Sequence, residues 1–541
     1  MTLVKMPPPT TTTAIADFLK PLDIDSNVVW ELSRELASTF KTLSAESLDQ
    51  FLPTPISESI LRPAAGLDTG RFLAIDIGGT NLRVAFVELL HDDGGSFSTG
   101  EPKAKREVNG FHTEDQSASP RRLNRLLEHS WPINDHLKNE NSESLFAWIG
   151  DQVAHVVRKA CDTFELRCQD ELPMGVTFSF PMKQSSLSEA TLMAMGKGFA
   201  ITSNLDLGGH LLKGYERHRT VDMPPIKIAA ISNDAVSTLV SFVYQYPAKG
   251  HQKAAMGVIV GTGCNATIPL KLSSLHASKR PVSISVLPDQ DIADVKIAVN
   301  TEWSINGSAP PLRKFGLISR WDELLDKAGE APGFQPLEYM TAGRYLGELA
   351  RLIFVDYMTT VLGLAGEAMP EKLQQRFGLT TTFISHFYPG SPRGDLLEQL
   401  EREFPLKGNT VLTQWTEPLA HALYSIAHAI EVRAAGIVAA STVGLLSCAE
   451  EIPLATGAAR TNGGDGLIAV KELAVGYTGG CIQYFQNYLA DTQKFIDEIL
   501  DLEFAGQTAP IRVTLSPCHD GGITGAGILV PAALGAEKLL R

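Results

Sequence analysis

The sequence predicts a mixed α/β protein built as two lobes around a cleft, and three observations support this fold class. The chain has 541 residues, of which 44% are hydrophobic and 20% charged, the balance of a folded protein. At about 100 to 200 residues per domain, this length favours two or more lobes. Two strand–turn–strand patterns with glycine turns, at 72–89 and 256–270, also suggest a pseudo-duplicated pair of lobes.

The charge and the reactive residues exclude several functional classes. Lys and Arg number 47 and Asp and Glu 61, a net charge of −14, so we expect no nucleic-acid partner. The 6 cysteines form no CxxC pair and the 13 histidines no HExxH motif, which argues against a structural zinc site or a disulfide framework. No apolar run reaches the roughly 18 residues of a membrane span, so we expect no membrane insertion and a cytoplasmic location.

The order of predicted elements begins with a helical N-terminal prefix over 1–70, because apolar residues recur at helical spacing from 14 to 51 before Pro53 and Pro55. A buried strand at 72–77, a turn at 78–81 and a return strand at 82–89 form the first hairpin. The segment 96–119 is polar and predicts an exposed loop. The remaining predictions are helices near 121–137, 143–164, 343–362 and 419–446, the second hairpin at 256–270, and a final strand with a glycine-rich turn near 511–527.

The two glycine turns have the composition of phosphate-binding loops, since glycines let backbone N–H groups approach an anion without intervening side chains. Asp76 ends the first buried strand, where its carboxylate could hold hydrated Mg²⁺; a tight β-turn with a solvated aspartate is the alternative. Residues 261–266 also fit the G-x-G-x-x-A dinucleotide fingerprint. A β-like run containing Pro269 follows instead of a helix, and no Walker motif occurs, which excludes both of those nucleotide folds.

Several blocks resemble the motifs of eukaryotic hexokinases, a branch of the actin-like ATPase superfamily. The run LAIDIGGTNLRV at 73–84 is similar to the family's phosphate-1 motif and VGTGCNA at 260–266 to phosphate-2. The other matching blocks, in family order, are VTFSFP at 176–181 (sugar loop), SNDAVSTL at 232–239 (catalytic aspartate), NTEW at 300–303 and LEYMTAGRYLGEL at 337–349 (sugar-binding glutamates) and the glycine turn at 520–526.

The resemblance implies a two-lobed actin-like (ribonuclease H-like) hexokinase fold with a central cleft. The small lobe is then expected at 71–226 and the large lobe at 227–541, and a return of the C-terminal segment to the small lobe is left open. The implied activity is transfer of the γ-phosphoryl group of ATP, with Mg²⁺, to the 6-hydroxyl of a hexose-type sugar. We expect sugar and ATP as small-molecule partners.

The implied catalytic residues are Asp234 as the base on the sugar hydroxyl and Lys197 as the stabiliser of transferring charge. Without the resemblance, Asn233 and Asp234 indicate a turn or helix cap and Lys197 a solvated surface residue. The implied sugar-binding residues are Ser179, Lys197, Asn233, Asp234, Asn265, Asn300, Glu302 and Glu338. The implied nucleotide-binding residues are Asp76 (also the metal ligand), Gly78, Gly79, Thr80, Asn81, Arg83, Gly261, Thr262, Gly343, Arg344, Gly476, Gly479 and Gly480.

The chain departs from the family pattern in its sugar loop, where Met195 and Gly196 stand in place of tryptophan and threonine. Loss of the indole and the hydroxyl frees space beside the ring, and the family includes fungal N-acetylglucosamine kinases, whose 2-acetamido substrate needs such space. By this resemblance we hypothesise an N-acetylglucosamine kinase-like or atypical member, with N-acetylglucosamine as the substrate and glucose as the next candidate; neutral drift in a glucose kinase is the alternative. Thr478 and Gly480 replace an aspartate and a serine of the adenosine loop, and Ser304 replaces a glycine. A catalytically weak or inactive sugar-sensing regulatory protein therefore stays open as a second function.

Overall fold

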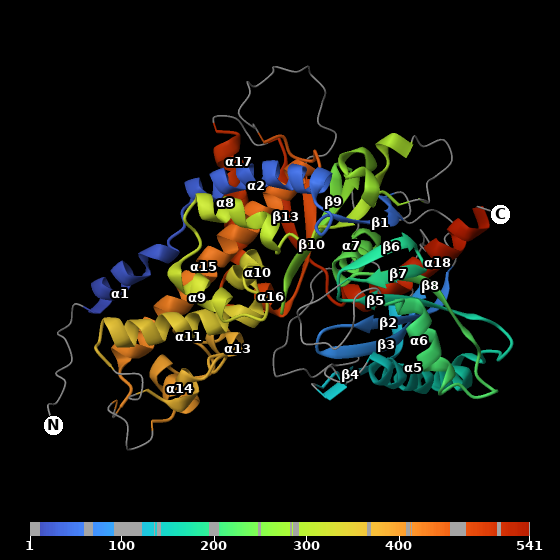
Figure 1. Cartoon of the computed structure of the whole chain (residues 1–541), viewed down its shortest axis with the longest axis horizontal. Coiled ribbons are helices and arrows are strands. Elements are labelled where there is room, and N and C mark those ends of the chain that lie inside the picture. The colour runs from blue at the N-terminus through green and yellow to red at the C-terminus, as the bar shows by residue number, and fades with distance from the viewer. Residues whose placement is uncertain are drawn as a thin grey trace.

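The computed structural model contains two large β-sheets, with helices gathered mainly around the second of them (Figure 1). It describes residues 11–58, 69–90, 122–134, 136–137, 142–193, 205–246, 250–281, 284, 292–364, 369–406, 412, 414–454, 472–505 and 510–539. The mixed α/β class expected from the sequence is confirmed.

The first sheet has five strands in the order β4-β3-β2-β5-β8. Its strands are β2 (Gly70–Ile77), β3 (Asn81–Leu89), β4 (Leu123–Pro132), β5 (Leu172–Phe178) and β8 (Ile226–Ser232). Strands β2, β3 and β4 pair antiparallel and β2, β5 and β8 parallel, so the first predicted hairpin is confirmed. One face packs on α5 (Ser142–Phe164) and α6 (Leu207–Glu216) through alternate residues such as Leu73 and Ile75.

The helix predicted near 121–137 is wrong, because this segment forms β4 at the edge of the first sheet. Its residues pair with β3 from Leu89 opposite Leu123 to Leu82 opposite Trp131, with a bulge near Leu127, whose φ is +49°. Pairing with an open sheet edge outweighs the local helical periodicity, because it satisfies the backbone groups of both strands.

The second sheet has six strands in the order β1-β11-β10-β9-β12-β13. Its strands are β1 (Leu52–Ser57), β9 (Gln252–Val260), β10 (Cys264–Lys271), β11 (Lys296–Asn300), β12 (Glu472–Thr478) and β13 (Arg512–Pro517). With β1 set aside, we count the strands of each sheet along the chain. In both sheets their spatial order is third, second, first, fourth, fifth, and corresponding neighbours pair in the same parallel or antiparallel sense. The structure therefore contains one topology twice. A small hairpin of β6 (Met182–Ser186) and β7 (Glu189–Leu192) accompanies the first sheet.

The helices around the second sheet include α15, which lies at the centre of the largest apolar core. By length and composition α15 could cross a membrane, but 89% of its most apolar window is buried inside the protein, as in a core helix. The helices of this region are α8 (Ala309–Lys314), α9 (Arg320–Lys327), α10 (Pro336–Thr341), α11 (Gly343–Thr360), α12 (Glu371–Gln374), α13 (Thr381–Ser385), α14 (Leu396–Glu403), α15 (Glu417–Cys448), α16 (Gly480–Tyr484) and α17 (Tyr488–Glu503). Short 3-10 helices lie at Lys20–Leu22, Leu272–Ser274, Ala277–Lys279, Ile292–Asp294 and Asn306–Ser308.

The N-terminal segment, predicted as a helical prefix, is part of this second body. Helices α1 (Thr11–Leu19) and α2 (Ser26–Glu46) pack on α15, and β1 joins the second sheet beside β11. Strand β1 carries Pro53 and Pro55, which were expected only to end the helix. It tolerates them because it is an edge strand, so the missing N–H groups remove few sheet hydrogen bonds.

Two helices cross between the sheets and connect them. Helix α7 (Asp234–Gln245) follows β8 of the first sheet but packs on β9 and β10 of the second. Helix α18 (Gly521–Leu539) follows β13 of the second sheet but packs on β2, β3, β5 and β8 of the first, and the two helices contact each other. The glycine-rich turn expected near 511–527 is mostly the first turns of α18. This exchange brings the starts of both helices close to the first glycine turn.

Candidate active site

The first glycine turn closes on itself and leaves Asp76 beside the start of α18. The Gly78 N–H donates to the Asn81 carbonyl at 2.9 Å, and a Cβ on Gly522 would lie 2.6 Å from Asp76 Oδ2. Burial raises the pKa of Asp76 from 3.8 to about 7; Arg83 opposes this shift and the charges of Asp234 and Asp520 add to it. A cation beside Asp76 would therefore compete with a proton.

The start of α7 carries a helix cap, and its residues Asn233 and Asp234 also line a cavity between the two sheets. Asn233 is the N-cap: its Oδ1 accepts from the Ala235 N–H at 2.9 Å, and Asp234 Oδ1 accepts from the same N–H at 2.9 Å. The helix-cap interpretation of this pair is thus correct for Asn233, and it does not exclude a role in a site. The helix dipole favours the negative charge of Asp234 in the first turn.

A cavity of about 200 Å³ lies between the two sheets, at the meeting point of both glycine turns, β5, α7, β10 and α10. Six of the residues predicted to bind sugar line it, while Asn300 lies behind its wall and is 3% exposed. Its lining residues are Gly79, Thr80, Ser179, Phe180, Pro181, Asn233, Asp234, Ile259, Thr262, Gly263, Cys264, Asn265, Glu302 and Glu338.

One wall of the cavity is an amide and carboxylate network. The Asn265 amide donates to Asn300 Oδ1 at 2.9 Å and to Glu302 Oε1 at 3.1 Å, and the Asn300 amide donates to Glu302 Oε1 at 2.8 Å. Glu302 has φ +46°, and the Gln50 amide donates to its carbonyl at 2.9 Å. These bonds fix the Glu302 carboxylate before any ligand binds.

Glu338 supplies the least satisfied group of the wall. Glu338 is only 4% exposed, and its Oε2 accepts a hydrogen bond from the Cys264 N–H at 3.2 Å. Its Oε1 is buried and has no hydrogen-bond partner among the residues that the structure describes. An unpaired buried carboxylate oxygen is costly, so this atom is suited to accept a hydroxyl from a ligand.

A longer groove of about 490 Å³ runs from the second turn toward α13 and α16. Thr262 lines both the groove and the smaller cavity, so the two spaces meet at this residue. The Gly343 and Arg344 N–H groups donate to the carbonyls of Gly261 and Thr262, at 2.8 and 3.2 Å, which docks α11 on the turn. The groove is lined by Gly261, Thr262, Gly343, Arg344, Thr381, Thr382, Ser385, His386, Gly480, Cys481 and Tyr484.

Three other residues predicted to bind the nucleotide lie against other parts of the protein. Gly476 lies inside β12, where a Cβ would come 2.4 Å from the Phe242 ring; it is not among the groove residues, and its nucleotide-binding role stays a prediction. Gly479 has φ +117°, a conformation that favours glycine, and lies against Val260. Arg83 is held in an ion pair with Asp520 at 2.8 Å.

The sugar loop and Ser304 are the positions of the predicted sugar region where the chain departs from the family pattern. The predicted catalytic residue Lys197 and the altered loop at Met195 and Gly196 lie outside the described residues. Ser304, which stands where the family has glycine, is buried and donates its hydroxyl to the Cys264 carbonyl. It therefore fastens the strand whose N–H holds Glu338.

Several residues of the site were not predicted, because no motif points to them. Gln50 stands in no motif, and neither does the five-residue helix α13, which with His386 after it supplies Thr381, Thr382 and Ser385 to the groove. Tyr484 is 58% exposed at the groove, and an aromatic residue shortly after the glycines at 479 and 480 is the one hint the sequence offers.

The chemistry of the donors allows a magnesium ion. Among the described residues no group of three or more His, Cys, Asp or Glu side chains could hold a metal by itself. Mg²⁺ commonly binds through one or two carboxylates together with substrate phosphates and water, so it does not need such a group. Asp76, whose side chain is half-buried and near the charges of Asp234 and Asp520, fits that pattern.

Comparison with known proteins identifies consistent relatives. One family model described as hexokinase matches residues 255–532, and a second matches residues 14–244. Hexokinase-1 of Nicotiana tabacum is 27% identical over 469 residues, covering 86% of this chain and 80% of the relative. Hexokinase-1 of Saccharomyces cerevisiae is 26% identical over 478 residues, covering 88% and 82%.

Among solved structures, a Schistosoma mansoni hexokinase complexed with glucose matches with a TM-score of 0.71 and 22% identity, covering 96% of this chain and 99% of that one. A second structure described as a hexokinase matches with a TM-score of 0.66 and 21% identity, covering 97% and 99%. The two-lobed fold expected from the sequence motifs is thereby confirmed.

Proposed function

This chain belongs to the hexokinase family and is a sugar kinase of that family, and from this premise we propose that it transfers the γ-phosphoryl group of ATP to the 6-hydroxyl of a hexose-type sugar. The observation that carries the proposal is the junction at Thr262, which lines both the carboxylate-walled cavity and the long groove. A sugar in the cavity and a nucleotide in the groove would bring a hydroxyl and a terminal phosphate together there.

In this proposal Asp234 accepts the proton of the reacting hydroxyl. It lines the cavity in the first turn of α7, and Asn233 beside it is held by its cap hydrogen bond and so can orient the same hydroxyl. Glu302 and Asn265 bind ring hydroxyls from a network that is already fixed, and Glu338 Oε1 gains the hydroxyl partner that it lacks.

On the nucleotide side of this proposal, Gly261 and Thr262 of the second turn face the phosphates from the groove and Gly79 and Thr80 of the first turn from the adjoining cavity, while the α13 hydroxyls and Tyr484 line the far end of the groove. Bound Mg²⁺ would neutralise charge on the transferring phosphate, and Asp76 is the residue that fits its coordination. Closure of the two lobes would exclude water, which limits hydrolysis of ATP.

For the substrate we propose N-acetylglucosamine ahead of glucose. The support is the sequence alone: Gly196 and Met195 replace a hydroxyl-bearing and an indole-bearing residue, and a 2-acetamido group needs such space. The relatives named hexokinase and the glucose-bound relative favour glucose instead.

The test is an ADP-release assay with glucose, fructose, mannose and N-acetylglucosamine, each at saturating MgATP. A larger kcat/KM with N-acetylglucosamine supports the amino-sugar substrate. Equal or greater kcat/KM with glucose removes that substrate but keeps the kinase, and no turnover with any sugar contradicts the kinase.

The second candidate is a sugar-sensing regulatory protein that binds sugar without turnover. The substitutions at Thr478 and Gly480, on the adenosine side, favour it. Calorimetric sugar binding without product, even at high protein concentration, would support this function. The sequence retains Asp76, Lys197, Asp234, Glu302 and Glu338, which speaks for the kinase, because loss of any of them is the simplest route to an inactive protein.

A further inference from the structure

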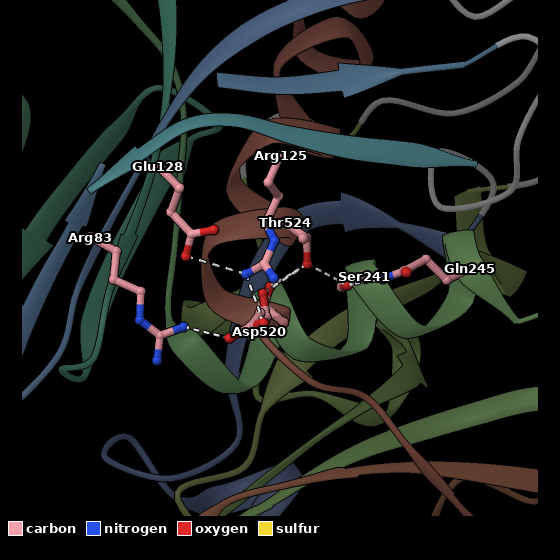
Figure 2. A network of polar contacts seen from close by, with 8 residues as sticks. Arg83, Arg125, Glu128, Ser241, Gln245, Asp520 and Thr524 are labelled. Atoms are coloured by element: carbon pink, nitrogen blue, oxygen red, sulfur yellow. Dashed lines mark hydrogen bonds and ion pairs between the residues drawn. The ribbon is translucent and has the colours of Figure 1, made fainter. Parts of the chain in front are cut away.

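Asp520, just before α18, is held by two arginines from the first sheet (Figure 2). Arg83 of β3 donates to Asp520 Oδ1 at 2.8 Å, and Arg125 of β4 lies 2.7 Å from Asp520 Oδ2. The two carboxylate oxygens are therefore each paired with a different arginine. Arg83 lies in the phosphate-1 segment, whereas Arg125 belongs to no motif of the sequence.

Further contacts hold both Arg125 and the backbone of Asp520. Glu128, on the same strand as Arg125, lies 3.4 Å from Arg125 Nη1. Thr524 donates to the Asp520 carbonyl at 2.9 Å, and its hydroxyl lies 2.6 Å from the Ser241 hydroxyl of α7 (Figure 2). The Asp520 backbone has φ +57°. The Asp520 backbone is thus tied to both crossing helices, which limits how far its carboxylate can follow an arginine that leaves.

We propose that Arg125 is a positioning residue for the phosphoryl transfer: it keeps Asp520 paired so that Arg83 can leave that carboxylate for a nucleotide phosphate. This inference rests on the proposed kinase function, since it needs a phosphate near the first turn. Arg83 uses Nη1 for Asp520, and a bidentate contact to a phosphate would draw on the same planar set of donors, so the two anions compete for one guanidinium.

The charges explain why a second arginine matters. Asp520 and Arg83 have about a third of their side chains exposed and Arg125 about a fifth, so water only partly replaces a lost partner. The negative charge of Asp520 also disfavours the ionised form of Asp76. If Arg83 left an otherwise unpaired Asp520, the carboxylate would lose a charged hydrogen bond and repel Asp76 more strongly. Arg125 removes both costs.

The first experiment measures Arg125→Met by steady-state kinetics with varied MgATP at saturating sugar, together with calorimetric binding of MgATP. We expect KM for ATP to rise and nucleotide affinity to fall about tenfold, with the KM for sugar unchanged. Arg125→Lys, which keeps a cation beside Asp520, should recover most of the loss. Arg71→Met is the matched control, because Arg71 forms an ion pair with Glu88 at 2.9 Å in the same sheet.

The second experiment separates positioning from a structural tie by adding Asp520→Asn to Arg125→Met. Under the proposal the double variant regains ATP affinity relative to Arg125→Met, because a neutral amide no longer competes for Arg83. A purely structural tie leaves the double variant as impaired as the single one or more so. Thermal melting of each variant shows whether a loss follows from unfolding.

An unchanged ATP affinity in Arg125→Met, or no recovery in the folded double variant, overturns the inference while the wild-type kinase stands. A wild-type protein that neither binds MgATP nor phosphorylates a sugar overturns the proposed function, and the inference with it. The two failures are therefore distinguished by the wild-type protein alone.

Discussion

The two glycine-turn hairpins have the same topology but carry different chemistry. In the first hairpin Asp76 lies opposite Arg83, and in the second the same register position pairs Ile259 with Asn265. The first hairpin therefore presents charges and the second an apolar residue and an amide that binds Glu302. The duplicated topology places side chains at equivalent positions in the two hairpins. The residue type at each position then decides whether it serves phosphoryl transfer or sugar recognition.

The crossing helices differ in the same way. Helix α7 begins with Asp234, which lines the cavity, whereas α18 follows Asp520, which is occupied by two arginines. We therefore expect substitutions of the first hairpin and α7 to affect turnover, and substitutions of the second-sheet walls to affect affinity.

The largest expected effect is that of Asp234→Ala, which removes the proposed base. We expect kcat to fall by about 10²–10⁴-fold, because a positioned general base contributes about that much. Coupled ADP release measures the rate and a thermal melt checks folding. The control is Asp222→Ala, a change to an exposed aspartate. If only a KM changes, the assignment of turnover to α7 is wrong.

A smaller effect is expected for Glu338→Gln, on the recognition side. The neutral amide keeps the shape and the bond from Cys264 but binds a hydroxyl more weakly than a carboxylate, so KM for sugar should rise about 10- to 100-fold. The KM for ATP should stay close to that of the wild type. Glu323→Gln, at an exposed position of α9, is the control. An effect confined to kcat would contradict the division between the two halves.

Tyr484→Ala tests the far end of the groove. Tyr484 is 58% exposed there, and stacking of a base on an aromatic ring is worth about 1–3 kcal/mol, of which an exposed ring retains the lower part. We expect KM for ATP to rise about fivefold with kcat and sugar KM unchanged. Leu324→Ala, another exposed apolar residue, serves as the comparison. No change in KM would show that the base does not contact this ring.

The smallest expected effect is a pH-dependent change in stability from Asp76→Asn. Burial raises the pKa of Asp76 to about 7, so between about pH 4 and 7 the folded chain holds a proton that the unfolded chain releases. Asp76 therefore lowers stability as pH rises through this window, and asparagine does not. At pH 8 without nucleotide, Asp76→Asn should melt about 1–3 °C higher than the wild type, and the difference should vanish near pH 4.

The measurement is Tm against pH, with Asp222→Asn as the exposed control. A constant difference at every pH would mean that the gain does not come from titration of Asp76. The same variant should lose activity at all pH values, since the amide cannot replace a carboxylate toward magnesium.

Local patterns predicted much of the scaffold. Both hairpins were recognisable because strand alternation and glycine turns are signals within about twenty residues, and α15 because its apolar run is long. The segment at 121–137 was predicted wrongly, because β4 exists only as a partner of β3. Strand β1 was missed for the same reason, since its partner β11 lies more than 200 residues away.

The candidate site divides along the same line. Asp234, Thr262 and Glu302 stand in motifs and were named from the sequence, and all three line the cavity. Gln50 and Arg125 carry no motif, and their importance comes from what they contact: the Glu302 carbonyl and the Asp520 carboxylate. Such roles depend on partners distant in the chain, so no local pattern contains them.

The sequence by itself determined the glycine turns, the position of Asp76 at the end of the strand before the first turn and the helix cap at Asn233, because steric freedom and short-range hydrogen bonds are encoded by neighbouring residues. Only the tertiary structure decided that the two turns face one cavity, that Glu338 keeps an unpaired oxygen and that Asp76 holds its proton to about pH 7. Burial and electrostatic coupling depend on which segments pack together, and the exchange of α7 and α18 between the sheets sets that packing.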